Sequence, residues 1–132
     1  MTGCPMLVAA DVLESAAWYV EILGADNAHP GDEFAMIMHD SQLVLMLHHK
    51  TFNEHPALEV PEGPTAGAGV LLYFWVDDVD ASFARATAIG AAALDKPHMN
   101  PNAQALEFSL RDPDGYAVTI AAKRRQEEAN AG

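Results

Sequence analysis

Cysteine is nearly absent from this sequence of 132 residues, in which Cys4 is the single example. One cysteine excludes an internal disulfide and a cysteine-rich zinc site. Long hydrophobic runs are also missing, and nothing approaches the roughly 20 apolar residues that a membrane helix needs. The first residues lack a basic segment followed by an apolar stretch, the pattern of a signal peptide. The sequence therefore predicts a cytoplasmic protein without a membrane partner.

Basic residues are scarce as well, with 7 Lys and Arg against 19 Asp and Glu and a net charge of −12. Residues 1–84 contain thirteen acids and one base, whereas residues 85–132 contain six of each. Nucleic-acid binding depends on Lys and Arg that neutralise phosphates, so we do not expect a nucleic-acid partner. An acidic surface attracts cationic ligands at long range. Acids of this kind also serve solubility alone.

Two similar segments indicate an internal duplication. Residues 11–17 align with residues 78–84, with Asp, Val, Ser and the last Ala in common, and each segment precedes a Gly-Ala pair. The chain has the length of one domain, and half of its residues are hydrophobic. We predict a single α+β domain. Its parts are module one at about 4–50, a linker rich in Pro, Gly and Glu at about 51–69, module two at about 70–122, and a tail at 123–132.

Each module is expected to begin with a strand and then an aspartate-capped helix. Asp11 and Asp78 suit the N-cap position, Glu14 completes a capping-box pattern, and Gly24 suits the C-terminal end of the first helix. The apolar residues at helical spacing, which predict the buried face of this helix, are Leu13, Ala16, Ala17, Val20 and Leu23.

Further strands are predicted after each helix, at about 33–39 and 43–49 in module one and at about 105–111 and 116–122 in module two. The last two flank residues 112–115, an Asp-Pro-Asp-Gly sequence typical of a tight turn.

The predicted strand at 69–76 is apolar on both faces. Because Val76 leads directly into the second helix, we expect the set Val70, Leu72, Phe74 and Val76 to pack on the helices. Leu71, Tyr73 and Trp75 then point the other way, toward an opposing sheet or a ligand cavity. Tyr and Trp rings suit planar or cationic ligands, although Trp75 could equally be an ordinary core residue.

The ordered set of motifs resembles the vicinal-oxygen-chelate superfamily of glyoxalases, extradiol dioxygenases and bleomycin-resistance proteins. The resemblance rests on residues 11–24 with Trp18-Tyr19, on residues 76–80 (Val-Asp-Asp-Val-Asp), and on residues 111–115 (Arg-Asp-Pro-Asp-Gly). It extends over about residues 4–122. It implies two βαβββ modules that form half-open barrels, usually in a homodimer.

Enzymes of the superfamily hold a divalent metal with His and Glu on the first and last strands of each module. The resemblance places these positions at Cys4, Leu45, Leu71 and Thr119. Only Cys4 among them could bind a metal, as a thiolate. We therefore predict no metal cofactor, with a non-standard site that uses His39 or His48 and a carboxylate as the alternative.

Within the superfamily the sequence is most similar to the bleomycin-resistance branch, whose members bind a drug without chemistry. This predicts a binding protein, rather than an enzyme, that sequesters a small aromatic or cationic ligand. Phe34, Tyr73 and Trp75 are the predicted stacking surfaces, and His39 and Glu107 the predicted polar groups. The alternatives are a metal-dependent glyoxalase-like lyase or isomerase, a dioxygenase, and an interaction module without a small ligand.

Overall fold

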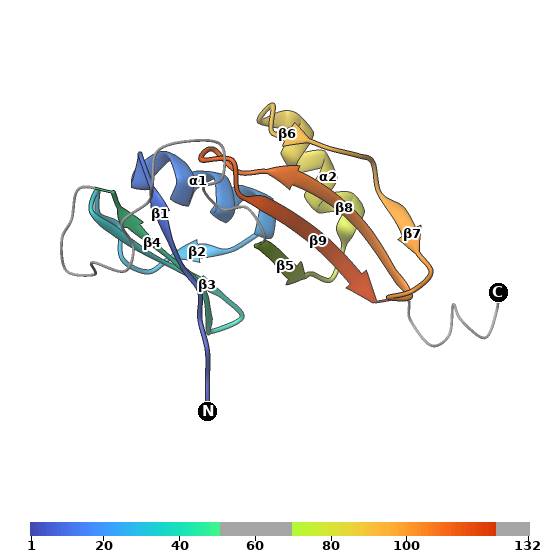
Figure 1. The fold of residues 1–132 in the computed structure, drawn as a ribbon, viewed down its shortest axis with the longest axis horizontal. Coiled ribbons are helices and arrows are strands. Elements are labelled where there is room, and N and C mark those ends of the chain that lie inside the picture. Colours follow the sequence, from blue (N-terminus) through green and yellow to red (C-terminus); the bar gives the residue numbers. More distant parts are fainter. Residues whose placement is uncertain (51–69, 124–132) are drawn as a thin grey trace. The chain divides into compact units, whose positions relative to one another are not determined.

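The computed structural model in Figure 1 describes residues 1–50 and 70–123, which divide into two compact units. The first unit contains residues 1–50 together with the turn at 113–115, and the second contains residues 70–112 and 116–123. The predicted linker at 51–69 and all but the first residue of the predicted tail lie outside the described residues. No helix in the described ranges is long and apolar enough to cross a membrane.

The first unit has the order strand, helix and three strands. Its elements are β1 (Met6–Ala9), α1 (Val12–Leu23), β2 (Asp26–Asn27), β3 (Phe34–His39) and β4 (Gln42–His49). The strands form a sheet in the order β1-β4-β3-β2, in which β1 runs parallel to β4 and the other pairs are antiparallel. Helix α1 packs on β3 and β4.

Helix α1 begins and ends where the sequence predicts. The Asp11 side chain accepts a hydrogen bond of 3.0 Å from the backbone N–H of Glu14, and Gly24 adopts the left-handed conformation at φ 64°. The predicted buried face is wrong in part, because Leu13 is 53% exposed. Ala17 is exposed as well, whereas Ala16 and Leu23 are buried as predicted. The buried residues that the prediction missed are Val12, Ser15, Trp18, Tyr19 and Ile22. Two overlapping apolar stripes exist in this helix, and the stripe with the large Tyr19 and Ile22 side chains forms the core.

The turn at 113–115 belongs to the first unit, to which Asp114 makes two hydrogen bonds. One Asp114 carboxylate oxygen accepts a hydrogen bond of 2.9 Å from the backbone N–H of Ala10, and the other accepts one of 3.1 Å from the Ser15 hydroxyl. A carboxylate at this position also complements the positive end of the α1 dipole. The Asp-Pro-Asp-Gly sequence thus makes a tight turn and stabilises the start of a helix about 100 residues earlier in the chain.

The second unit repeats this plan and adds one short strand, β7, which lies off the main order of the sheet. Its elements are β5 (Leu71–Trp75), α2 (Val79–Ala88), β6 (Ala92–Ala93), β7 (His98–Asn100), β8 (Ala105–Arg111) and β9 (Ala117–Lys123). The strand order is β5-β9-β8-β6, with β7 also paired to β8, and β5 runs parallel to β9. The Asp78 side chain caps α2 by accepting a hydrogen bond from the backbone N–H of Ala81, as predicted.

The two faces of the second sheet differ sharply in burial. On the side of α2, Phe108 is fully buried, and the Phe83 ring of α2 meets it edge-on with 5.1 Å between ring centroids. Leu72 is buried, whereas Leu71 and Trp75 are 54% and 48% exposed, so the predicted sidedness of this strand is confirmed for these residues. Val70 lies outside the strand and is exposed.

The predicted α+β class with βαβββ modules is confirmed. The sequence missed the three shortest strands, β2, β6 and β7, because two or three residues are too few to show a periodic pattern.

Candidate ligand-binding site

The side of the second sheet that faces away from α2 carries most of the predicted site. The strand register places Tyr73 opposite Thr119 and Thr119 opposite Ser109. The next row consists of Trp75, Ala121 and Glu107. Residues directly opposite each other on neighbouring strands project from the same side of a sheet. We call this surface, defined by Tyr73, Trp75 and Glu107, the aromatic face.

The two rings of the aromatic face are neighbours along β5. Tyr73 and Trp75 are separated by one residue, which brings their ring centroids to 5.1 Å with an angle of 59° between the ring planes. Trp75 is about half exposed. A tilted aromatic pair of this kind offers ring faces and edges to a flat or positively charged ligand.

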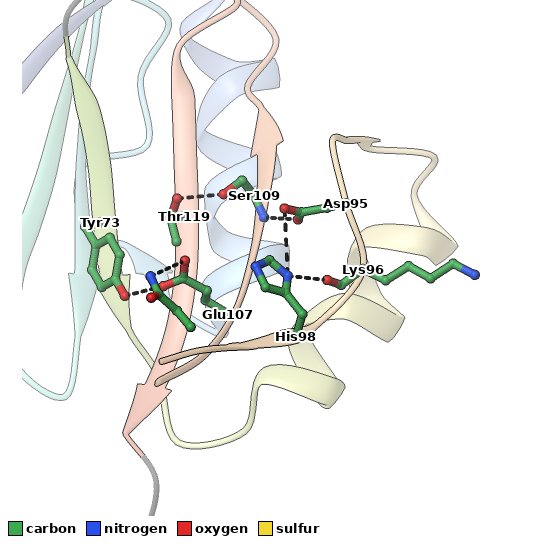
Figure 2. Close-up of polar contacts among 8 residues, drawn as sticks. Tyr73, Asp95, Lys96, His98, Glu107, Ser109 and Thr119 are labelled. Atoms are coloured by element: carbon green, nitrogen blue, oxygen red, sulfur yellow. Dashed lines mark hydrogen bonds and ion pairs between the residues drawn. The ribbon is translucent and has the colours of Figure 1, made fainter. Parts of the chain in front are cut away.

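Glu107 is held by two uncharged hydrogen-bond donors. Figure 2 shows Tyr73 reaching toward Glu107 across the sheet, and its hydroxyl donates a bond of 2.6 Å to Oε2. The side-chain amide of Asn100 donates a bond of 3.1 Å to Oε1. The reach across β9 is possible because Ala121, which lies between Glu107 and Trp75, has only a methyl side chain. Both donors are neutral, so they orient the carboxylate without neutralising its negative charge.

The Tyr73 hydroxyl is a proton donor that holds its proton tightly. Burial, together with the hydrogen bond to Glu107 and the repulsion between two negative charges, raises the pKa of Tyr73 to about 12 from its ordinary value of 10.0. The phenol is therefore neutral at physiological pH and acts as the fixed donor of the Tyr73–Glu107 pair.

A second polar group, which the sequence did not predict, lies at the edge of the aromatic face. His98 of β7 stands opposite Glu107 in the register, and its Nδ1 is 2.9 Å from the carbonyl oxygen of Lys96 (Figure 2). Asp95 accepts a 2.7 Å hydrogen bond from the backbone N–H of Ser109 and lies 3.8 Å from the same His98 nitrogen. A carbonyl oxygen can only accept, so Nδ1 of His98 is the donor in this contact.

The Ser109 and Thr119 hydroxyls form a third polar feature, joined by a hydrogen bond of 2.8 Å (Figure 2). Thr119 is one of the positions at which the superfamily resemblance implies a metal ligand. In this chain its hydroxyl is engaged with Ser109 and its side chain is buried.

The other two predicted site residues, Phe34 and His39, belong to the first unit and stand at opposite ends of β3. The Phe34 ring contacts the rings of His29 and His48, and His39 pairs with Asp40 at 3.5 Å. Five residues of strand separate Phe34 from His39 by about 16 Å. The structure thus brings Tyr73, Trp75 and Glu107 together, and it does not cluster Phe34 with His39.

The positions implied for a divalent metal do not fit a His and Glu ligand set. Leu71 and Thr119 face the same side of the second sheet but supply no strong ligand. Leu45 is fully buried, and its partly exposed neighbour Met46 stands opposite Met6 as Thr119 stands opposite Tyr73. The position expected on this strand therefore falls at Met46, which is neither His nor Glu. Within residues 1–50 and 70–123, no three His, Cys, Asp or Glu side chains gather in a metal-binding arrangement.

Two βαβββ units, each with a parallel pairing of its first and last strands and an aspartate-capped helix, define a glyoxalase-like fold. The profile of the Glyoxalase/Bleomycin resistance protein/Dioxygenase superfamily matches residues 4–120, and the chain belongs to that superfamily. A search of curated proteins finds no match.

Solved structures support the same fold. A protein of unknown function from Agrobacterium tumefaciens str. C58 has a TM-score of 0.74 and 21% identity over 94% of each chain. Lactoylglutathione lyase from Agrobacterium tumefaciens has a TM-score of 0.64 and 21% identity over 92% of each chain. TioX from Micromonospora sp. ML1 has a TM-score of 0.68 and 18% identity, and the match covers 94% of this chain and 100% of TioX. At such identities the likeness establishes the fold and not an activity.

Proposed function

We propose that the protein binds a small aromatic cation on the aromatic face and sequesters it without chemistry, as in the bleomycin-resistance branch. The observation that carries the proposal is the Glu107 carboxylate, held at 2.6 Å by the Tyr73 hydroxyl in the same row as the Trp75 ring.

The spacing of that row suits a ligand of one ring or one substituted ammonium group. Glu107 and Trp75 lie on strands that are two steps apart, which corresponds to about 10 Å. Ala121 between them projects only a methyl group. A cationic group placed above Ala121 would touch the carboxylate on one side and the indole on the other.

The electrostatics favour a positive charge over a neutral ring. Both Glu107 oxygens accept hydrogen bonds from neutral groups, so a bound cation would supply the countercharge. A cation against an aromatic face contributes about 0.5–2 kcal/mol, with the larger values at desolvated sites. The raised pKa of Tyr73 also argues for binding rather than proton transfer, because a phenol that holds its proton to about pH 12 is a poor base at neutral pH.

A matched pair of probes tests the proposal by calorimetry: N-methylquinolinium, a flat cation, and quinoline, its neutral counterpart at pH 7.5. We expect the cation to bind more tightly, and Glu107→Gln to remove most of that preference. Since a hydrogen bond or contact to a charged group contributes about 1.5–3 kcal/mol, the loss corresponds to roughly 10- to 100-fold in affinity. Bleomycin serves as a larger cationic probe.

Glu33→Gln is the control, because Glu33 is an exposed acid in the first unit and its substitution changes the net charge equally. Equal losses in Glu107→Gln and Glu33→Gln would assign the preference to long-range attraction and contradict the proposed site. Absence of binding for every probe would leave the metal-dependent enzymes of the superfamily as the better hypothesis.

We also expect the protein to form a homodimer, because Leu71 and Trp75 expose apolar surface on a folded unit and such patches mark interfaces. Sedimentation at micromolar concentrations should give the mass of two chains. A monomer mass that does not change with concentration would contradict this expectation.

A further inference from the structure

Asn100, the last residue of β7, is fixed by the turn that follows it. Its side-chain carbonyl oxygen accepts hydrogen bonds from the backbone N–H groups of Asn102 (3.1 Å) and Ala103 (3.4 Å), and its backbone pairs with Ala105 at the start of β8. The amino group of the same amide lies 3.1 Å from Oε1 of Glu107. Because the carbonyl side of the amide is engaged by the turn, Asn100 acts toward Glu107 as a donor in a fixed place.

Tyr73 is a second fixed donor to the same carboxylate. Its ring lies against the ring of Trp75, and its hydroxyl donates to Oε2 of Glu107 (Figure 2). The raised pKa of Tyr73 keeps this hydroxyl protonated at neutral pH. Each oxygen of Glu107 is therefore held by a different neutral donor, and the carboxylate cannot rotate about its last bond without breaking both hydrogen bonds. A group held in this way is already in place for a ligand.

The carboxylate of Glu107 has acceptor capacity beyond these two bonds. An ionised carboxylate offers about four acceptor positions, two on each oxygen. The Tyr73 hydroxyl fills one on Oε2, and the Asn100 amide fills one on Oε1. Among residues 1–50 and 70–123, Glu107 has no further hydrogen bond and no ion pair, and its side chain is partly exposed. One acceptor position on each oxygen is left for water or for a ligand.

These acceptor positions distinguish two kinds of cation. A quaternary ammonium group carries a charge but no N–H, so it would displace water from Glu107 without replacing the hydrogen bonds, which costs free energy. A protonated amine or amidine supplies the charge and the N–H groups together, and hydrogen bonds between charged groups are about twice as strong as neutral ones. Contact with the Trp75 ring requires only the positive charge, so the ring suits both kinds.

We propose that the aromatic face binds ring compounds that carry a protonated amine or amidine, whose N–H groups donate to Glu107, in preference to quaternary ammonium compounds. Asn100 is the positioning residue for this specificity, because a hydrogen bond depends on the direction of the carboxylate whereas attraction between charges does not. The inference rests on the proposed function, since it concerns the same carboxylate. It adds the chemical class of the ligand and a role for Asn100.

A matched pair of cations tests the ligand class by calorimetry at pH 7.5. Benzylammonium and benzyltrimethylammonium have the same ring and the same charge, and they differ in the N–H groups. We expect the parent protein to bind benzylammonium at least about tenfold more tightly, the ratio that one hydrogen bond to a charged group represents. Glu107→Gln should remove this preference, because the amide lacks the charge and replaces one acceptor oxygen with a donor. Benzamidine, a planar cation with N–H groups, should behave like benzylammonium.

Asn100→Ala tests the positioning role. The substitution removes the donor to Oε1 and lets the carboxylate turn, so the affinity for benzylammonium should fall about fivefold, the ratio that one neutral hydrogen bond represents. The affinity for benzyltrimethylammonium should stay the same, which also shows that the variant is folded. Asn102→Ala is the matched control, since Asn102 is exposed and its backbone N–H, which bonds Asn100, is kept. It should bind both cations as the parent does.

The outcomes separate this inference from the proposed function. If benzyltrimethylammonium binds as tightly as benzylammonium, and Glu107→Gln weakens both while Glu33→Gln does not, the N–H preference is overturned and cation binding at Glu107 stands. If Glu107→Gln weakens neither cation more than Glu33→Gln does, both proposals are wrong.

The positioning role has its own decisive result. It is overturned if Asn100→Ala weakens both cations equally or weakens neither. Should Asn100→Ala fail to fold, as judged by circular dichroism, Tyr73→Phe removes the other donor to Glu107 and carries the same expectation for the two cations. Equal effects on both cations in Tyr73→Phe would then contradict the claim that the direction of the carboxylate determines the preference.

Discussion

The two units have the same backbone plan but carry different side chains on the sides of their sheets that face away from the helices. In both units the first strand runs parallel to the last, and an aspartate caps the helix that follows the first strand. With Asp11 aligned to Asp78, the row Met6, Met46 and Met36 of the first sheet corresponds to the row Tyr73, Thr119 and Ser109 of the second. The duplicated fold determines where open positions lie, and the side chains at those positions determine which ligand each face suits.

The comparison also shows that net charge is a poor guide to a site. The acids concentrate in residues 1–84, yet the row of Met6, Met46 and Met36 across the first sheet contains no carboxylate. The carboxylate that the second sheet holds on its open side, Glu107, comes from the electrically neutral part of the sequence. Acids on the surface raise the long-range attraction for cations, whereas one oriented carboxylate determines where a cation binds.

The largest effect is expected on the helix side of the second sheet rather than on its open side. Phe108→Ala removes a fully buried ring that packs on Phe83, and should lower the free energy of unfolding by about 3–5 kcal/mol. Trp75→Ala, at a half-exposed position, should lower it by less than about 1.5 kcal/mol. Urea denaturation measures both. Similar losses would mean that the side of the sheet with Trp75 is also part of a closed core, and would contradict the difference in burial between the two sides.

The second largest effect on the free energy of unfolding is expected for the carboxylates at the starts of the two helices. Asp114→Ala leaves the Ala10 N–H and the Ser15 hydroxyl without their acceptor, which should cost about 1–3 kcal/mol. Asp78→Ala removes only a cap from α2, which costs typically about 1 kcal/mol. Thermal unfolding of the two variants should rank Asp114→Ala as the more destabilised. The reverse ranking would show that the turn contributes little to the first unit.

A third prediction compares substitutions on the two sheets. Trp75→Ala should weaken N-methylquinolinium binding about tenfold, because stacking or cation–π contact at such a site contributes about 1–2 kcal/mol. Met46→Leu, on the first sheet, should leave the affinity for N-methylquinolinium unchanged. Calorimetry on the two variants measures both affinities. An equal loss in Met46→Leu would mean that binding of the cation is not confined to the aromatic face.

The smallest effect is the titration of Tyr73. Its raised pKa means that the folded protein favours the neutral phenol, so this stabilisation is fully present below pH 10 and is lost as the pH rises toward 12. Absorbance at alkaline pH should show one tyrosine with a pKa near 12, and Glu107→Gln should lower that pKa toward its ordinary value. Tyr73→Phe should remove the late titration entirely. Persistence of the late step in Tyr73→Phe would assign it to another tyrosine.

Much of the local structure could be read from the sequence. Asp11, Gly24 and Asp78 mark helix ends through backbone chemistry that involves only neighbouring residues. The outward direction of Leu71 and Trp75 follows from the alternation of side chains along a strand. The buried stripe of α1 could not be chosen in the same way, because Leu13 and Tyr19 are both apolar and only packing on β3 and β4 distinguishes them.

The α+β class, the two modules, the superfamily and the aromatic residues on an outward strand face could be inferred from the sequence, because they depend on local pattern and composition. The hydrogen bond of Tyr73 to Glu107 across Ala121, and the row of Met6, Met46 and Met36, are visible only in the folded structure. Both arrangements depend on the register between strands that are distant in the chain. A shift of one residue would turn each of these side chains to the opposite side of its sheet, and no periodic pattern within a strand specifies the partner it meets.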